Sequence, residues 1–323
     1  MNRIIKDTPI FAKIRRENRH HHIHHMHKSG FVNIIGRPNV GKSTLMNQLV
    51  GERMSIITNK PQTTRHRIFG ILSGDDFQIV FSDTPGFIRQ PSYRMQEMMN
   101  RFVGSSFEDA DLMLFVTETG EEYSAEDPLL ERMKTTGAPV FLVLNKTDLV
   151  SEEQAQQAVD QWKILVPFAQ TFAISALKGT GTAELLQAIL GALPEGPEYY
   201  PKDQLTDRPE RFFVSEIIRE KILDLYHQEV PYSCEVSIEE FQETETKDGA
   251  PLARIRAEIY VARKTHKPII IGKNGEAIKQ LGSEARKSIE TFLDTKVFLE
   301  LHVKVRENWR DDEIALRRFG YQQ

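Results

Sequence analysis

Apolar runs alternate with amphipathic stretches from residue 30 to about residue 195. We expect strands at "FVNIIG", "QIVFSDTPG", "LMLFVT", "PVFLVLN" and "TFAIS". We expect helices from Lys42, near 92–106, near 126–136, near 151–163 and at 182–192. Near-continuous apolar strands separated by helices are typical of a parallel sheet with helices on both faces. The pattern therefore predicts an α/β fold with a doubly wound, mostly parallel sheet.

A different pattern follows residue 196. The stretch "LPEGPEYYPKDQLTDRPE", rich in proline, glycine and charge, reads as a linker, which we place at 197–209. Beyond it we expect a helix at 211–228, strands near 232–240 and 252–262, helices on both sides of 272–275, and a strand at 296–305. The order αββααβ predicts a small α+β domain.

The N-terminal stretch has no apolar periodicity. Residues 20–27 read "HHHIHHMH", which fits a metal-binding tract, an expression tag or read-through sequence, and Met26 is an alternative start. We therefore expect a disordered extension at 1–27, a first domain at 28–196 and a second domain at 210–323.

The length and composition of the chain agree with this division and exclude some classes of protein. The chain has 323 residues, enough for two domains, with 40% apolar and 27% charged residues, as in ordinary globular proteins. A run of 18 apolar residues and a signal-peptide core are both missing, so we predict a cytoplasmic protein. The lone cysteine, Cys234, alternates with Val236 and Ile238, so we expect it in the core.

Charge is segregated within the second domain. Residues 210–248 carry 4 Lys/Arg and 11 Asp/Glu, whereas residues 254–287 carry 9 and 3. A basic stretch beside an acidic one suggests a face that meets a polyanion, although many charge runs are only solvated faces.

The stretch "GRPNVGKST", residues 36–44, has the spacing of a phosphate-binding P-loop between a strand and a helix. Backbone N–H groups of such a loop hold phosphates, Lys42 supplies a positive charge and Ser43 a magnesium ligand. In "DTPG", Asp83 ends a buried strand, where it can hold the magnesium shell, and the Gly86 amide can contact the γ-phosphate.

Motifs at two later strand ends indicate that the base of the nucleotide is guanine. In "NKTD", Asp148 can accept hydrogen bonds from both N1–H and the exocyclic amine of guanine. In "ISAL", a backbone amide can contact the base carbonyl. The order of these motifs at strand ends predicts a GTP/GDP site. Its predicted residues are Gly36, Asn39, Val40, Gly41, Lys42, Ser43, Thr44, Asp83, Asn145, Lys146, Asp148, Ser175, Ala176 and Leu177.

The segment "TNKPQTTRHR", residues 58–67, is a candidate switch. A threonine here that binds Mg²⁺ only while the γ-phosphate is present would order the segment with GTP. Thr64 is the first candidate and Thr63 the second. We assign Ser43, Thr64 and Asp83 to the metal, and Lys42, Thr64 and Gly86 to catalysis.

The residue after "DTPG" is Phe87. In Ras a glutamine at that position orients the attacking water, which a phenyl ring cannot do. We therefore expect slow intrinsic hydrolysis. Asn39 either holds a monovalent cation such as K⁺ beside the phosphates or shapes the loop.

A second glycine loop, Gly272-Lys273-Asn274-Gly275, is too short for a P-loop. Between two helices of an αββααβ domain, a G-x-x-G loop lets the backbone approach a nucleic-acid strand, as in KH domains. Nearby Lys267 and Lys279 add positive charge. We assign RNA binding to Lys267, Gly272, Lys273, Asn274, Gly275 and Lys279, with a plain helix–helix turn as the alternative.

Together with "QTTRHRI", "IIGKNGEAIKQLGSEARKSIE", "VFLELHVKV" and "NWRDDEIALRRFGY", these motifs resemble the Era family of bacterial GTPases over residues 28–321. The resemblance implies a TrmE-Era-EngA-like P-loop GTPase domain followed by a type II KH domain. It also implies binding to the 3′ end of small-subunit ribosomal RNA in 30S precursors, and peripheral association with the inner membrane. We expect a monomer.

Two other functions stay open. One is an RNA-binding assembly placeholder that barely hydrolyses GTP, which Phe87 favours and the intact Lys42, Ser43, Thr64 and Asp83 oppose. The other is a membrane-associated signalling GTPase whose basic stretch 254–287 meets anionic lipid.

Overall fold

The computed structural model describes residues 27–124 and 126–321. The chain forms two compact units. Of the described residues, the first contains those up to Ser55 together with Arg67–Ile88 and Asn100–Asp207, and the second contains Ile56–His66, Arg89–Met99 and those from Arg208. Two segments that we placed in the first domain, 56–66 and 89–99, thus belong to the second unit.

The expected N-terminal extension falls almost wholly outside the described residues. Its last residue, His27, is described, and its ring Nδ1 lies 2.8 Å from the carbonyl oxygen of Gly196. Lys28 follows as the first residue of a strand. His27 therefore belongs to the described part of the first unit, whereas our prediction assigns it to the extension.

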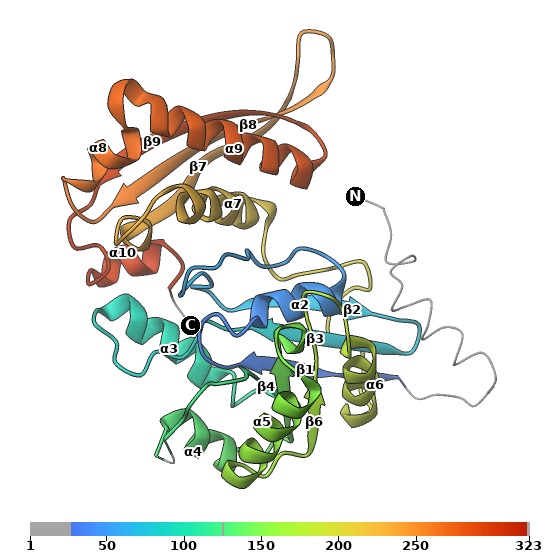
Figure 1. Ribbon diagram of the computed structural model, residues 1–323. Helices are drawn as coiled ribbons and strands as arrows, with labels where there is room; N and C mark the ends of the chain where they lie inside the picture. The colour runs from blue at the N-terminus through green and yellow to red at the C-terminus, as the bar shows by residue number, and fades with distance from the viewer. Residues whose placement is uncertain (1–26, 125, 322–323) are drawn as a thin grey trace. The chain divides into compact units, whose positions relative to one another are not determined.

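The described part of the first unit contains a six-stranded sheet in the order β2-β3-β1-β4-β5-β6, in which only the β2–β3 pair is antiparallel (Figure 1). This confirms the predicted mostly parallel sheet. Its strands are β1 (Lys28–Ile35), β2 (Ile68–Ser73), β3 (Phe77–Asp83), β4 (Leu112–Glu118), β5 (Val140–Asn145) and β6 (Gln170–Ala173). Its helices are α2 (Lys42–Val50), α3 (Arg94–Ser105), of which the second unit includes the first six residues, α4 (Pro128–Thr135), α5 (Glu152–Leu165) and α6 (Thr182–Ala192).

Helices cover both faces of this sheet, as the apolar patterning predicts. All six residues of β5 are buried, since both faces are covered. On one face, Leu130 of α4 and Trp162 of α5 pack with Phe115 of β4 in one core cluster. On the other face, α2 contacts β1, β2 and β3 and also α6 (Figure 1).

Strand β2 is the element that our strand predictions omitted. Its sequence, "IFGILS", pairs antiparallel with β3 at the edge of the sheet. A short apolar run with no alternation does not distinguish a strand from a buried loop or helix segment. Pairing with β3, a tertiary relationship, decides the conformation of this segment.

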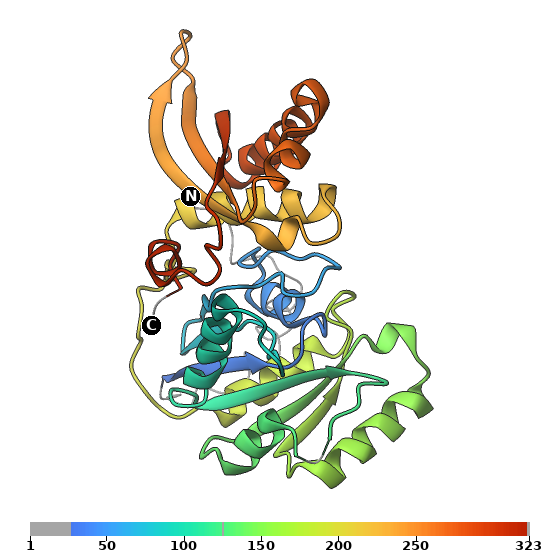
Figure 2. The same ribbon diagram turned by 90° about the vertical axis from the view of Figure 1, so that its left-hand side faces the viewer.

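The second unit has the predicted αββααβ order. The described strands β7 (Cys234–Glu245), β8 (Pro251–Val261) and β9 (Lys296–Val305) form a sheet in this order, with β8–β9 parallel. Figure 2 shows the β7–β8 hairpin projecting beyond the helices of this unit. The helices are α7 (Glu210–Leu225), α8 (His266–Ile271), α9 (Glu276–Leu293) and α10 (Glu313–Arg318).

The core of this unit lies between the sheet and the helices. Ile218 of α7, Ile259 of β8 and Ala285 of α9 are fully buried in one apolar cluster. Cys234 belongs to the same cluster, and burial raises the pKa of its thiol to about 12, so the expected core role is confirmed. Over residues 27–124 and 126–321, helices long and apolar enough to cross a membrane are absent.

Candidate nucleotide and RNA sites

The P-loop connects the end of β1 to α2, and two of its glycines are required by close contacts. Gly36 has φ 147°, and a Cβ there would lie 2.2 Å from the carbonyl oxygen of Val116. Gly41 has φ 94°, and a Cβ there would lie 2.2 Å from Asn145 Nδ2. These positions accept only glycine, because other residues add both backbone strain and a clash. The loop therefore passes tightly between β4 and the "NKTD" loop.

Helix α2 begins directly after Gly41, whose lack of a side chain leaves the first N–H groups of the helix without an N-cap hydrogen bond. Its first turn contains Lys42 and no acidic residue. Lys42 is only 6% exposed and donates to the carbonyl oxygens of Gly36 at 3.1 Å and Arg37 at 2.7 Å. Burial lowers the pKa of Lys42 to about 8, and the nearby Asp83 partly offsets this effect. A helix N-terminus with a buried ammonium group is suited to bind phosphate.

Ser43 and Asp83 lie together at the start of α2 and the end of β3. The Ser43 hydroxyl donates to Asp83 Oδ2 at 2.6 Å. A hydroxyl and a carboxylate are the hard oxygen donors that Mg²⁺ prefers, so these two residues fit the predicted metal role. The "DTPG" loop also approaches the P-loop closely, because a Cβ on Gly86 would lie 2.6 Å from the Pro38 backbone nitrogen.

Asn145, at the end of β5, connects the two sides of the predicted nucleotide site. Its Nδ2 donates to the Val40 carbonyl at 2.8 Å, and its Oδ1 accepts from the Ala176 N–H at 2.9 Å. The side chain is 3% exposed, so both hydrogen bonds lie away from water. Asn145 therefore fixes the P-loop relative to the "ISAL" loop.

The predicted base-recognition residues gather on the loops after β5 and β6. Asp148 Oδ1 accepts a 2.6 Å hydrogen bond from the Ser175 hydroxyl, and the Asp148 side chain is exposed. Lys146 has the left-handed φ of 62° and forms a 2.6 Å ion pair with Glu118. Leu177 is 75% exposed at the same place. The structure thus brings the "NKTD" and "ISAL" residues together.

Asn39 lies at the tip of the P-loop, and Thr44 lies at the end of the motif, in the first turn of α2. Asn39 is exposed and has a φ of 67°, whereas Thr44 is half-buried. Phe87 packs against the apolar core around Phe115 and Trp162, and its N–H donates to the Gly36 carbonyl at 3.3 Å. The ring at this position is therefore a packing residue.

Thr63 and Thr64 are buried and belong to the second unit. Thr63 Oγ1 lies 2.7 Å from Thr58 Oγ1, and it donates to the Lys60 carbonyl at 2.6 Å. The assignment of Thr64 to the metal and to catalysis stays a prediction.

The short glycine loop lies between α8 and α9, as predicted. Gly272 has φ 73°, and a Cβ there would lie 2.6 Å from the Ala277 Cβ. Asn274 and Gly275 also have positive φ angles, of 53° and 78°. This tight turn exposes the side chains of Lys273 and Asn274, while Lys267 on α8 and Lys279 on α9 are exposed on either side.

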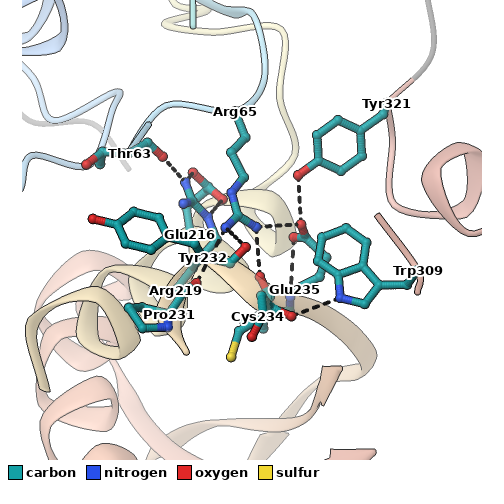
Figure 3. Close-up of polar contacts among 12 residues, drawn as sticks. Thr63, Arg65, Glu216, Arg219, Pro231, Tyr232, Cys234, Glu235, Trp309 and Tyr321 are labelled. Atoms are coloured by element: carbon teal, nitrogen blue, oxygen red, sulfur yellow. Dashed lines mark hydrogen bonds and ion pairs between the residues drawn. The ribbon is translucent and has the colours of Figure 1, made fainter. Parts of the chain in front are cut away.

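A cluster of buried charges in the second unit was absent from our predictions (Figure 3). Arg65 forms a 3.1 Å ion pair with Glu235, and Arg219 forms one of 2.5 Å with Glu216. Tyr321, near the C-terminus, donates to Glu235 at 2.8 Å. In the sequence, the signal for this buried cluster is a set of charged residues inside otherwise apolar stretches, such as "SEIIRE" in α7.

Comparison with known families also finds two parts in the chain, and the match to the first family includes residues 56–66 and 89–99. Residues 31–146 match a family described as a 50S ribosome-binding GTPase, and residues 229–310 match the KH domain family.

Relatives and solved structures extend the similarity over most of the chain. The GTPase Era of Syntrophus aciditrophicus is 48% identical over 297 residues, covering 92% of this chain and 96% of the relative. The GTPase Era of Carboxydothermus hydrogenoformans is 43% identical over 296 residues, covering 91% and 98%. A crystal structure of Era in complex with MgGDPNP and nucleotides 1506–1542 of 16S ribosomal RNA superimposes with a TM-score of 0.86 at 38% identity. That match covers 92% of this chain and 100% of the solved one.

Proposed function

Because this chain belongs to the Era family of GTPases, we propose that it uses its GTP state to control binding to the 3′ region of small-subunit ribosomal RNA. In this role it acts in 30S subunit assembly and ribosomal RNA maturation. The observation that carries the proposal is the presence of two candidate sites in one chain. A guanine-nucleotide site is built around Asn145, and an exposed G-x-x-G turn is built between α8 and α9.

The nucleotide site supports recognition of both phosphate and base. The N-terminus of α2 and the ammonium group of Lys42 bind the phosphates, and Asp148 accepts from the guanine edge. Ser43 and Asp83 would hold magnesium, which would supply positive charge to neutralise the phosphates. We assign Thr64 and the Gly86 amide to contacts with the metal and the γ-phosphate.

Slow intrinsic hydrolysis follows from the position of Phe87. Its ring packs in the core of the first unit and has no hydrogen-bonding group with which to orient water. We assign Asn39, which is exposed at the tip of the P-loop, to the binding of K⁺ against the phosphates. Hydrolysis by this chain should therefore be faster in potassium buffer than in sodium buffer.

The RNA site supports a clamp on the nucleic-acid backbone. The glycine turn lets the backbone approach phosphates, and Lys267, Lys273 and Lys279 surround it with positive charge. The same basic stretch, residues 254–287, supports peripheral association of a monomeric cytoplasmic protein with the inner membrane. Pelleting with anionic vesicles, with and without competing RNA, tests this secondary association.

The central test is single-turnover GTP hydrolysis with and without an RNA of the 3′-terminal nucleotides of small-subunit ribosomal RNA. Binding of the same RNA is measured in parallel with GDP and with a non-hydrolysable GTP analogue. We expect hydrolysis in the first experiment and nucleotide-dependent RNA affinity in the second. Binding of RNA with no turnover under either condition would favour an assembly placeholder, and equal RNA affinity in both nucleotide states would refute the proposed control.

A further inference from the structure

The segment Ile56–His66 follows the P-loop helix in the sequence but packs inside the unit that carries the RNA clamp. Thr63, Thr64, Arg65 and His66 are all buried there. This segment contains Thr64, the residue proposed to bind magnesium when GTP is present. Its contacts within the second unit therefore bear on how the nucleotide state affects the RNA clamp.

Arg65 binds the backbone carbonyls on both sides of Ser233 (Figure 3). Its guanidinium donates to the carbonyl oxygens of Cys234 at 2.7 Å and Tyr232 at 3.1 Å, besides its ion pair with Glu235. The Arg65 side chain is only 2% exposed. A buried guanidinium with several acceptors in fixed positions holds the backbone at residues 232–234 in one conformation.

Lys60, in the same segment, binds the C-terminus of α7. Its ammonium donates to the carbonyl oxygens of Leu223 and Tyr226, at the C-terminus of α7. A lysine at this position satisfies the last carbonyls of the helix and interacts favourably with its dipole. In return, Arg219 of α7 donates to the Thr63 carbonyl, so the segment and the helix hold each other (Figure 3).

The two regions that Arg65 and Lys60 bind, residues 232–234 and the C-terminus of α7, both contact α8, the helix that ends at the RNA clamp. The Tyr226 hydroxyl donates to the Ile270 carbonyl at 2.7 Å, within a buried environment. The Ser233 hydroxyl lies 2.7 Å from Nδ1 of His266. His266 is the first residue of α8 and Ile270 the last but one, and Gly272 follows directly. The C-terminal end of this helix is thus held by Tyr226, whose carbonyl binds Lys60. The N-terminal end is held by Ser233, whose two neighbours bind Arg65 through their carbonyls.

We propose that Lys60 and Arg65 transmit the nucleotide state from the switch segment to the Gly272–Gly275 clamp, through Tyr226 and Ser233. The inference rests on the proposed control of RNA binding by GTP. Thr64 lies between Thr63 and Arg65 in the chain, so recruiting its hydroxyl to a magnesium ion changes the positions of both neighbours. Lys60 is linked to Thr63, whose hydroxyl donates to the Lys60 carbonyl. The carbonyls that Lys60 and Arg65 hold, and with them α8, respond to that change. By reciprocity, RNA bound at the clamp shifts the affinity for GTP by the same factor.

The test measures a coupling factor, the ratio of RNA affinities with a non-hydrolysable GTP analogue and with GDP. The RNA is the 3′-terminal fragment described above, and the full-length protein is used. Tyr226→Phe removes only the hydroxyl that reaches α8, and Lys60→Met removes the ammonium at the end of α7. Arg65→Met is combined with Glu235→Gln, because the single change leaves a buried carboxylate without its cation. Lys247→Met, on the exposed β7–β8 turn, is the control for loss of one positive charge.

We expect a coupling factor of about 5-fold or more in the wild type, in either direction. It should fall to within about twofold of one in Tyr226→Phe, in Lys60→Met and in the double variant of Arg65 and Glu235, but not in Lys247→Met. GTP affinity in the absence of RNA should be unchanged in Tyr226→Phe and Lys60→Met. A wild-type factor of one would refute the proposed control itself. A wild-type factor that Tyr226→Phe and Lys60→Met both retain, in protein of unchanged melting temperature, would overturn this inference alone.

Discussion

The hydroxyl of Ser43 and the carboxylate of Asp83 are 2.6 Å apart, although forty residues separate them in the chain. Their oxygens come from the first turn of α2 and the end of β3, so two rigid elements place them. Ser43→Ala removes one of the two donors while Asp83 remains. We expect magnesium affinity in the nucleotide complex to fall about 10- to 100-fold. Titrating Mg²⁺ against a fluorescent GDP complex measures this change, and GDP affinity in EDTA serves as the control.

Nucleotide affinity should depend on the charge of Lys42. Burial lowers its pKa to about 8 in the free protein, whereas phosphates favour the charged ammonium. Below that pH Lys42 is already protonated, but above it binding requires uptake of a proton. GTP affinity should therefore fall by roughly tenfold per pH unit above about 8. Calorimetry in two buffers of different ionisation enthalpy detects the proton, and an absence of uptake near pH 8.5 (roughly half a unit above the pKa) would contradict the assignment.

Specificity for guanine should depend on Asp148. Its Oδ1 accepts from the Ser175 hydroxyl, which orients the carboxylate on the loop after β5. Asp148→Asn replaces a charged acceptor by an amide that donates where xanthine has a carbonyl oxygen. GTP binding should weaken by about 1.5–3 kcal/mol, while binding of xanthosine triphosphate improves. Competition between the two nucleotides measures the change, and unaltered GTP affinity in this variant would exclude Asp148 from base recognition.

Folding stability should depend on the protonation of His66. Burial, partly offset by Glu216, lowers the pKa of this side chain to about 4, and its ring lies 4.5 Å from that of Tyr321. As the pH falls below about 6.5, the unfolded chain gains a proton at His66 that the folded chain does not. The contribution of neutral His66 is therefore complete above about pH 6.5 and is lost as the pH falls toward 4, with a maximum near 3 kcal/mol.

Urea denaturation of the wild type and of His66→Gln at several pH values isolates this contribution from that of the carboxylates. We expect the stability difference between the two proteins to shrink as the pH falls. A difference that stays constant over this range would show that His66 does not titrate as its burial implies.

The sequence was sufficient to predict what depends on local spacing. The P-loop, the strand-end motifs and the G-x-x-G turn each need particular residues at fixed intervals, and the structure places each of them at the expected strand or helix end. Strand β2 could not be predicted, because its conformation depends on pairing with β3. Nor could the burial of Arg65 beside Glu235, since this ion pair joins residues 170 positions apart. Spacing patterns carry no information about such tertiary partners, which is why the switch segment was placed in the first domain.

The exposed turn at Lys273 and Asn274 should be the closest approach to the RNA backbone. Replacing both residues by aspartate adds negative charge there while keeping Gly272 and Gly275, whose positive φ angles form the turn. RNA affinity should fall and its salt dependence should flatten by about one phosphate contact, because one lysine contact is lost. GTP affinity without RNA should not change, since the P-loop belongs to the first unit. Gln242→Asp with Lys247→Asp, at exposed positions of the β7–β8 hairpin, makes the same charge change away from the turn and should have a much smaller effect. Normal binding of single-stranded ribosomal RNA by the Lys273 and Asn274 variant, or loss of GTP binding in the absence of RNA, would rule out the clamp.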